Sequence, residues 1–176
     1  METNDLGDYL IRKNVRKEAM REISRDYPLN EEMLKKYRNE LDWAEVSDNS
    51  NIGWTVAMIE RWKNKLDWKV LSNTSNTALL TTEVIEKFKN QWDWETLSMN
   101  TDLILSFDLI DKFIDCWDWS NLINRQFHNE DGFSYWELLR RYRQYIPVED
   151  IERTCLWSFL VDEEISVIKK ELVLGE

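Results

Sequence analysis

Four aspartates recur at a nearly constant spacing, and carboxylates are side chains that bind cations and move protons. They lie 25 or 26 residues apart, each directly before a tryptophan, and are Asp42, Asp67, Asp93 and Asp118. A shared metal ion needs two carboxylates within about 5 Å of each other, and an acid–base pair needs them within about 9.5 Å. Neighbouring helices lie about 10 Å apart. The column therefore predicts helix capping, and a carboxylate ladder that holds cations or imitates phosphates is the alternative.

Few other residues could react. His128 is the single histidine, in a polar segment with the character of a loop, and Cys116 and Cys155 have no Cys or His at metal-binding spacing. A nucleophilic site needs a base held beside the nucleophile, and a structural zinc needs four ligands. We therefore expect no catalytic residue, no metal and no cofactor, and predict that the protein is not an enzyme.

Three arginines form the one group with the chemistry of a phosphate contact. They are Arg140, Arg141 and Arg143, and acidic residues flank them on both sides. The chain has 23 Lys and Arg against 34 Asp and Glu, a net charge of −11, with no segment that forms a basic patch. Nucleic-acid binding normally leaves such a patch. A solvated helix face is thus the simpler interpretation. The acidic balance is typical of a merely soluble acidic protein, and a partner with a basic surface or imitation of a nucleic acid are the alternatives.

Tryptophan is used far more than usual, ten times in 176 residues. Eight tryptophans occupy positions where other repeats have Leu, Ile, Phe or Tyr, which indicates burial, because aromatic side chains supply much core area. These eight are Trp43, Trp54, Trp62, Trp68, Trp92, Trp94, Trp117 and Trp119. Trp136 and Trp157 lie outside the regular repeats. Packing at the end of the array is their expected use, and contact with a partner is the alternative, which makes them candidate partner contacts.

The elements that position these residues are repeats of about 25 residues. In each repeat the apolar positions of one helix are separated by 1, 3 and 4 residues, as in Met33, Leu34, Tyr37 and Leu41. This spacing places them on one helical face, and a period shared by many columns indicates a repeat array. The predicted N-caps of these helices are Asn30, Thr55, Thr81 and Ser106.

Each recurring aspartate predicts the start of a second, shorter helix. In the first repeat Asp42 stands at the N-cap and Glu45 three residues on, which is the spacing of a capping box. A polar turn follows each short helix, and we take Asp48 and Asp102 in these turns as candidate partner contacts.

The pattern predicts an all-α, short helical-repeat solenoid with divergent N- and C-terminal capping helices in one continuous domain. Residues 1–27 are expected to form the N-terminal capping helix, 28–123 four regular repeats, and 124–176 a degenerate fifth repeat and the C-terminal capping helices. In the fifth repeat Val148 stands at the tryptophan position. Divergent ends cover the apolar ends of a solenoid. The inward face of the first helix is predicted to carry Leu10, Val15, Ala19 and Ile23.

Two segments carry a resemblance to known sequences. They are Leu66–Ser72 (LDWKVLS) and Ile85–Trp94 (IEKFKNQWDW). They resemble the tandem Trp-Asp-Trp repeats of uncharacterised proteins from large DNA viruses, phages and bacteria, over roughly residues 28–123. The resemblance implies a helical repeat scaffold and a viral or phage genome as a source, and it brings no known activity, catalytic residue or cofactor.

The predicted architecture favours a binding function, by class of fold rather than by site. We expect a non-catalytic, cytoplasmic protein without a signal peptide or a membrane span, which grips another protein or a ribonucleoprotein. In a phage it would inhibit a host defence nuclease or CRISPR effector in the host cytoplasm; in a bacterium it would be an immunity protein that neutralises a toxin. The alternatives are a nucleic-acid binder that uses Arg140 to Arg143 and a structural module that self-associates through its capping helices.

Overall fold

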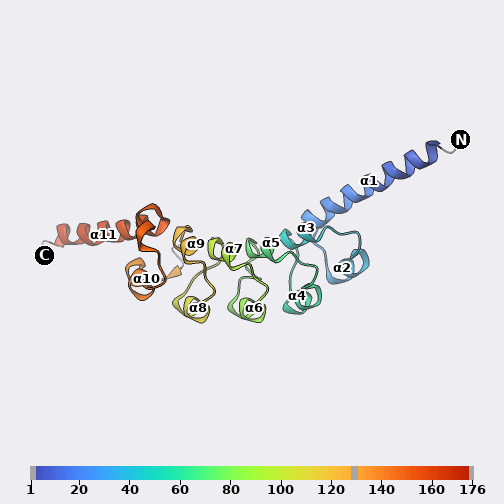
Figure 1. The fold of residues 1–176 in the computed structure, drawn as a ribbon. Helices are drawn as coiled ribbons and strands as arrows, with labels where there is room; N and C mark the ends of the chain where they lie inside the picture. Colours follow the sequence, from blue (N-terminus) through green and yellow to red (C-terminus); the bar gives the residue numbers. More distant parts are fainter. Residues whose placement is uncertain (1–2, 128–130, 175–176) are drawn as a thin grey trace. The chain divides into compact units, whose positions relative to one another are not determined.

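The computed structural model describes residues 3–127 and 131–174, and every regular element in those ranges is a helix. The predicted all-α fold class is therefore confirmed. The chain forms two compact units, Met1–Trp92 and Asp93–Glu176, here named the N-terminal and C-terminal units (Figure 1). None of the described helices has the length and apolarity needed to cross a membrane.

The described residues of the N-terminal unit, 3–92, form six helices in an alternating arrangement. They are α1 (Thr3–Asp26), α2 (Glu31–Tyr37), α3 (Trp43–Asp48), α4 (Val56–Trp62), α5 (Trp68–Ser72) and α6 (Thr82–Lys87). In Figure 1, α2, α4 and α6 follow one another along one side and α3 and α5 along the other. Helix α1 packs on α3, and α3 packs on α5. Each repeat is thus a pair of helices, a leading helix such as α2 and an Asp-Trp helix such as α3.

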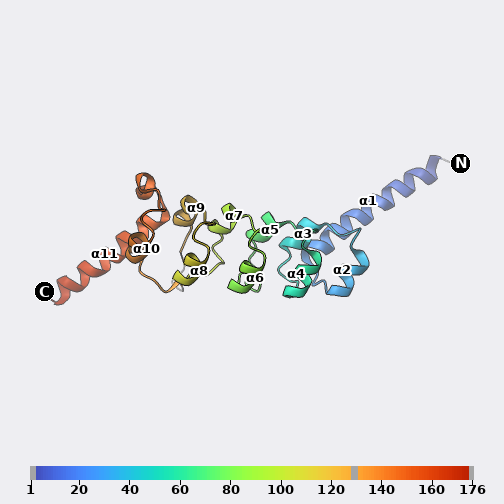
Figure 2. The ribbon, with the colours of Figure 1, turned by 60° about the horizontal axis from the view of Figure 1, so that its bottom comes forward.

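The C-terminal unit continues the same alternation and then departs from it. Its helices are α7 (Trp94–Met99), α8 (Phe107–Lys112), α9 (Trp119–Asn124), α10 (Tyr135–Arg141), the 3-10 helix η2 (Val148–Arg153) and α11 (Cys155–Leu174). The Asp-Trp helices α7 and α9 contact each other, and α11 packs on α9, α10 and η2. The turned view of Figure 2 shows α11 running away from this group toward the C-terminus.

The predicted N-caps are confirmed in both kinds of helix. The side chain of Asn30 accepts a hydrogen bond from the N–H of Met33 at 3.0 Å, and Asp118 accepts one from Asn121 at 2.8 Å. The other caps that accept such a bond are Thr55, Thr81, Ser106, Asp42, Asp67 and Asp93. Each cap satisfies an N–H that the first helical turn leaves open, so the aspartate column has a local structural role.

The leading helices are shorter than predicted. Helix α2 ends at Tyr37, and the chain turns so that the N–H groups of Glu40 and Leu41 both donate to the Tyr37 carbonyl, at 2.8 and 3.0 Å. The carbonyl of Arg38 instead accepts the indole N–H of Trp43 at 3.0 Å. The two helices of a repeat therefore have nearly the same length, because the following tryptophan caps the first one.

The predicted inward face of α1 is wrong. Leu10, Val15, Ala19 and Ile23 are all exposed, and the buried side chains among those described in α1 are Met20 and Ser24. The reason is that the last two turns of α1 take the place of an Asp-Trp helix against α3, with Met20 at the tryptophan position. The rest of α1 has no such neighbour to turn an apolar face toward.

The degenerate fifth repeat has the predicted register. Leu138, Tyr142, Ile146 and Ile151 are all buried. Its second element is the 3-10 helix η2, which begins after Pro147 without a side-chain cap. The closing segment is the single helix α11, which buries Leu156 and Leu160, whereas Ile165 and Ile168 lie exposed on it.

Candidate functional site

The tryptophan after each capping aspartate bridges two successive repeats. The indole N–H of Trp68 donates to the carbonyl of Lys63 in its own repeat at 2.8 Å. Its ring centroid lies 5.3 Å from that of Phe88 and 5.1 Å from that of Trp92, both in the next repeat. Trp94 makes the same two ring contacts in the C-terminal unit. Such pairs stabilise by about 0.5–1.5 kcal/mol beyond area burial, so these rings join repeats.

The eight tryptophans predicted in the core pack inside the units at two depths. Four of them are buried near the leading helices. They are Trp54, which precedes α4, Trp62, at the end of α4, and Trp92 and Trp117, which follow α6 and α8. The four after the aspartates are half-buried, and they are Trp43, Trp68, Trp94 and Trp119. The predicted burial is therefore confirmed for the first four, whereas the second four are only partly covered.

A buried serine adds a second link between repeats, which the sequence analysis did not predict. The hydroxyl of Ser47 donates to the carbonyl of Trp43 at 2.6 Å and accepts the N–H of Asp67 at 2.9 Å. In the C-terminal unit Ser98 accepts the N–H of Asp118 at 3.0 Å. The hydroxyl both donates and accepts, so one serine closes a helical turn and fixes the start of the next Asp-Trp helix.

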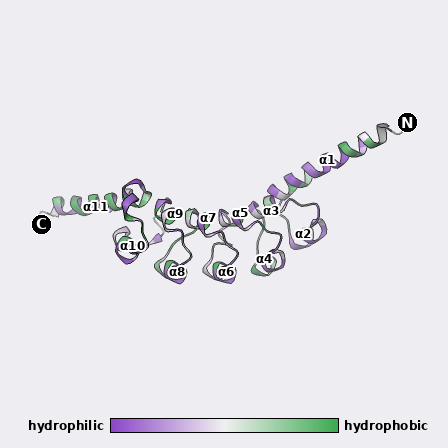
Figure 3. Ribbon diagram, viewed as in Figure 1, coloured by the Kyte–Doolittle hydropathy of each residue, from purple (hydrophilic) through white to green (hydrophobic). Residues whose placement is uncertain are grey.

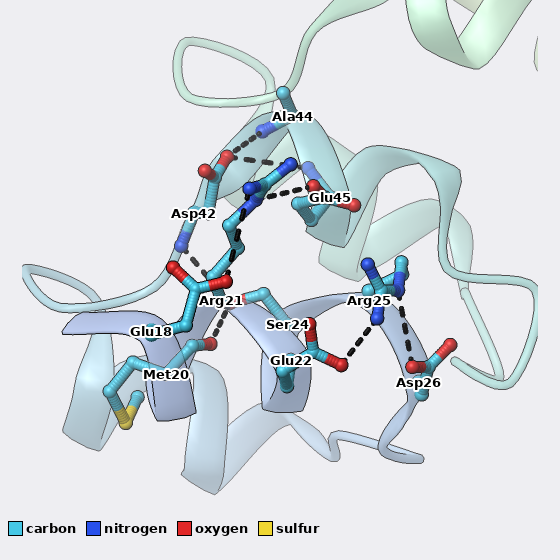
Figure 4. A network of polar contacts seen from close by, with 10 residues as sticks. All are labelled: Glu18, Met20, Arg21, Glu22, Ser24, Arg25, Asp26, Asp42, Ala44 and Glu45. Carbon is cyan, nitrogen blue, oxygen red and sulfur yellow. Dashed lines mark hydrogen bonds and ion pairs between the residues drawn. The ribbon is translucent and has the colours of Figure 1, made fainter. Parts of the chain in front are cut away.

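The first of these links joins α1 to α3 (Figure 4). The N–H of Asp42 donates to the hydroxyl of Ser24 at 3.0 Å, and the Glu45 carboxylate accepts from the Nε of Arg21 at 2.9 Å. This hydrogen bond raises the pKa of Arg21. Half of the predicted capping box is confirmed, because the Asp42 side chain accepts the N–H of Glu45 at 3.4 Å. The other half, in which Glu45 would accept the Asp42 N–H, is wrong, because α1 supplies other partners for both groups.

The hydrogen bond between serine and the next aspartate is absent after the fourth repeat, because both of its residues are replaced there. Ile123 is fully buried four residues after Trp119, where earlier repeats have serine, and Pro147 stands where they have aspartate. Both residues line the same surface hollow of about 370 Å³. Proline has no N–H, so a serine at position 123 would find no such donor. The two replacements remove donor and acceptor together and avoid an unpaired buried group.

A second buried polar column contains one arginine, which the sequence analysis missed. Its positions lie six residues after the tryptophan that follows each capping aspartate. The column consists of Asn49, Thr74, Asn100 and Arg125. Nη2 of Arg125 donates to the Leu103 carbonyl at 2.7 Å, and the guanidinium lies 5.9 Å from the Phe127 ring centroid. Burial lowers the pKa of Arg125, and the nearby carboxylates of Asp131 and Asp102 oppose that lowering. These carboxylates compensate a buried cation.

The two turn aspartates chosen as candidate contacts therefore differ in their surroundings. Asp48 is exposed at the end of α3 in the N-terminal unit. Asp102 is exposed in the C-terminal unit, but its N–H donates to Oδ1 of Asn100 at 2.8 Å and its charge acts on Arg125. Asp48 is thus the cleaner candidate for a contact with a partner, whereas Asp102 also has a structural task.

The arginine cluster of the fifth repeat is partly engaged in contacts within the unit. Arg141 forms an ion pair with Asp111 and lies over the Phe107 ring at 4.9 Å. Nε of Arg140 donates to the carbonyl of Trp136 at 3.3 Å. Arg143 is exposed. All three arginines are thus exposed, and two of them make contacts within the unit.

Arg141 belongs to a column of basic residues at the ends of the leading helices. The column consists of Lys36, Arg61, Lys87, Lys112 and Arg141. In the N-terminal unit Arg61 pairs with Glu31 of the preceding repeat, and Lys87 pairs with Glu60 at 3.5 Å. Exposed pairs of this kind each stabilise by at most about 1 kcal/mol. Their consequence is electrostatic, because neighbouring acids offset the positive charge along this column.

A surface hollow of about 460 Å³ lies between the start of α10 and α11 in the C-terminal unit. Trp136, which is 38% exposed, lines it together with Phe159 and Glu163. The Glu163 carboxylate accepts the N–H groups of Tyr135 and Trp136 at 2.9 and 3.1 Å. Trp157, 39% exposed, does not line this hollow. The structure thus exposes both predicted contact tryptophans without gathering them in one site.

Residues 3–127 and 131–174 bring together no three His, Cys, Asp or Glu side chains as metal ligands. Cys116 and Cys155 are half-buried free thiols. The candidate loop residue His128 lies outside the described residues.

No protein-family model, curated protein or solved structure matches this chain. The resemblance to tandem Trp-Asp-Trp repeat proteins therefore rests on residues 28–123 alone, and a function has to be argued from the protein's own surface.

Proposed function

We propose that this protein is a non-catalytic binding protein that grips and blocks another protein or a ribonucleoprotein. The observation that carries the proposal is a division of labour among the residues of each repeat. The recurring aspartates, tryptophans and serines are used in caps, ring contacts and hydrogen bonds inside the two units. The exposed positions between them vary from repeat to repeat, and repeat proteins bind through such positions.

The charge of the chain supports a partner with a basic surface. With a net charge of −11, the protein would approach such a partner under favourable long-range attraction. Nucleases and ribonucleoprotein effectors have basic surfaces because they contact phosphates. We therefore place the protein among phage inhibitors of host defence nucleases or CRISPR effectors, acting in the host cytoplasm, or among immunity proteins that neutralise a toxin.

Direct binding of nucleic acid is the weaker candidate. It would use Arg140, Arg141 and Arg143, yet Arg141 is paired with Asp111 and Arg140 bonds to its own helix. Arginines that neutralise phosphates give a binding constant that falls steeply with salt. No binding of labelled DNA or RNA at low salt would remove this candidate.

Affinity capture from a lysate of the source organism or its host tests the main proposal. The immobilised protein is used with and without nuclease treatment, and we expect one protein at stoichiometric yield in both samples. Recovery that disappears with nuclease would contradict binding to a protein alone and would make nucleic acid the ligand, directly or within a ribonucleoprotein.

Two charge reversals make the capture specific. Asp48→Lys, in the candidate contact turn, is expected to reduce recovery of the partner. Asp8→Lys changes the net charge equally at another exposed position and is expected to leave recovery unchanged. Equal recovery with both variants would remove Asp48 from the contact surface.

A further inference from the structure

The second half of α11 is largely uncovered, and among the described residues only Ser166, Val167 and Lys170 of this half line the hollow beside the start of α10. Every side chain from Glu164 to Val173 is exposed, and Figures 1 and 2 show this end of the helix beyond the rest of its unit. Half of these ten residues are aliphatic, and they are Ile165, Val167, Ile168, Leu172 and Val173. Figure 3 shows hydrophobic residues recurring along the helix. A helical stretch this short is marginal in water, and uncovered apolar surface indicates a partner.

The exposed aliphatic residues form a stripe with the spacing of a helix pair. Val161, Ile165, Ile168 and Leu172 are separated by 4, 3 and 4 positions, which is the alternation of a and d positions in a heptad. Trp157 stands four residues before Val161, at the g position that flanks the stripe. This side of α11 is distinct from the side that buries Leu156 and Leu160 against the unit.

The charges beside the stripe distinguish among possible partners. Glu164 and Lys169 flank it, at the g and e positions of the heptad, and neither has an opposite charge three or four residues away in α11. They therefore cannot form the usual ion pairs within the helix. In a parallel pair of helices a g residue faces the e residue five positions on in the other helix, so Glu164 of each copy would face Lys169 of the other.

Other occupants fit this pattern less well. In an antiparallel pair, g positions face g positions, which would set Glu164 of one copy near Glu171 of the other. Helices that lie on membrane surfaces have lysine and arginine on their polar face, whereas Asp162, Glu163, Glu164 and Glu171 outnumber the two lysines of this segment.

We propose that α11 pairs in parallel with α11 of a second copy of this chain, through the stripe Val161, Ile165, Ile168 and Leu172. Two symmetric ion pairs between Glu164 and Lys169 fix the parallel direction. The stripe covers about two heptads, so the dimer is weak and forms with rising concentration. This contact does not rest on the proposed binding function.

Sedimentation equilibrium from low micromolar to near-millimolar concentration tests the stripe. The wild type is expected to pass from monomer to dimer, and Ile168→Glu is expected to stay monomeric. Val167→Glu is the matched control, because Val167 is 46% exposed against 45% for Ile168 but lies off the stripe; it should dimerise as the wild type does. Far-UV circular dichroism verifies that both variants keep their helices. A monomeric wild type, or equal losses in the two variants, would overturn the proposal.

A charge swap tests the parallel direction. Glu164→Lys and Lys169→Glu each turn two attractions into repulsions and should weaken dimerisation about tenfold. The double variant restores both pairs and should dimerise within about threefold of the wild type. If the double variant is as weak as the single variants, the helices do not pair in parallel through these residues.

Discussion

The backbone N–H of Asp67 donates to the hydroxyl of Ser47 across 2.9 Å, although the two residues are twenty positions apart and belong to successive repeats. The same hydroxyl donates to the Trp43 carbonyl at 2.6 Å. Ser47 is almost completely buried, so water does not compete for these bonds. The link fixes where the next Asp-Trp helix begins and holds it against the one before.

Replacing this serine is expected to lower stability. Ser47→Ala leaves the partly buried Asp67 N–H without its acceptor, which costs about 1–3 kcal/mol of the free energy of unfolding. Urea unfolding followed by far-UV circular dichroism measures the change. Ser50→Ala, in the exposed turn that follows α3, is the control and should stay within about 0.5 kcal/mol of the wild type. Equal changes at the two serines would contradict the role of the link.

Filling the hollow beside α1 is expected to raise stability. Met20 takes the tryptophan position, and a hollow of about 290 Å³ remains beside it, lined also by Leu29, Met33 and Tyr37. An indole there can pack on Tyr37, as Trp43 packs on the aromatic residue of the next repeat. Met20→Trp should therefore add about 0.5–2 kcal/mol, measured as a higher urea midpoint.

The control for this substitution is Met99→Trp, because Met99 is exposed in α7 and a larger side chain there meets no hollow. We expect no gain in its urea midpoint. A Met20→Trp protein less stable than the wild type would mean that α1 does not take the place of an Asp-Trp helix.

The two turn aspartates are expected to respond differently to charge reversal. Asp102→Lys places a positive charge near the buried guanidinium of Arg125, where it opposes the charged form, so the thermal midpoint should fall by several degrees. Asp48→Lys, at an exposed helix end, should leave the midpoint within about 2 °C of the wild type. Thermal melts by circular dichroism compare them, and an unchanged midpoint for Asp102→Lys would remove Asp102 from the compensation of Arg125.

Alkaline pH is expected to destabilise the C-terminal unit through Tyr142. Burial first, and then the hydrogen bond that its hydroxyl donates to Asp111 at 2.7 Å, raise the pKa of Tyr142 above its usual value. The native pKa thus lies above that of the unfolded chain. The stabilisation is complete below about pH 10 and is lost as pH rises through the native pKa.

Tyr142→Phe isolates this contribution. At neutral pH the variant should be less stable by about 1 kcal/mol, because a hydrogen bond is lost. Its urea midpoint should then fall less steeply than that of the wild type above about pH 10. If the urea midpoints of the two proteins fall equally steeply with pH, ionisation of Tyr142 does not cause the loss of stability at alkaline pH.

The local part of this fold follows from the sequence because its signals act over a few residues. Caps such as Asn30 and Asp118 bond to N–H groups three residues ahead, and the 1, 3, 4 spacing is a property of one helix. The fixed period then predicts which aromatic residues pack. The same period also shows which residues lie outside the recurring positions. The exposed candidates Asp48, Trp136 and Trp157 could be selected in this way.

The misses arise from contacts between residues far apart in the sequence. The sequence around Ser24 does not show that its hydroxyl accepts the N–H of Asp42. The predicted inward face of α1 was therefore that of an isolated amphipathic helix. The position of Glu45 predicts a capping box, but in the structure its carboxylate accepts a hydrogen bond from Arg21 of another helix. The residues next to Arg125 in the sequence give no sign of its burial, which depends on Leu103 and Asp131 around it. Two polar columns recur at the repeat period, one of serine and one that contains asparagine. They were the sequence signal that could have revealed these links.

A double-mutant cycle on Trp68 and Phe88 tests most directly the central claim that tryptophans join the repeats and leave the outward positions free for a partner. Trp68→Ala alone should cost about 3–5 kcal/mol, whereas Trp136→Ala, at an exposed position, should cost less than about 1 kcal/mol. Combined with Phe88→Ala, the unfolding free energies should give a favourable coupling of about 0.5–1.5 kcal/mol for the two rings. A coupling near zero, with Trp68→Ala as mild as Trp136→Ala, would contradict the account.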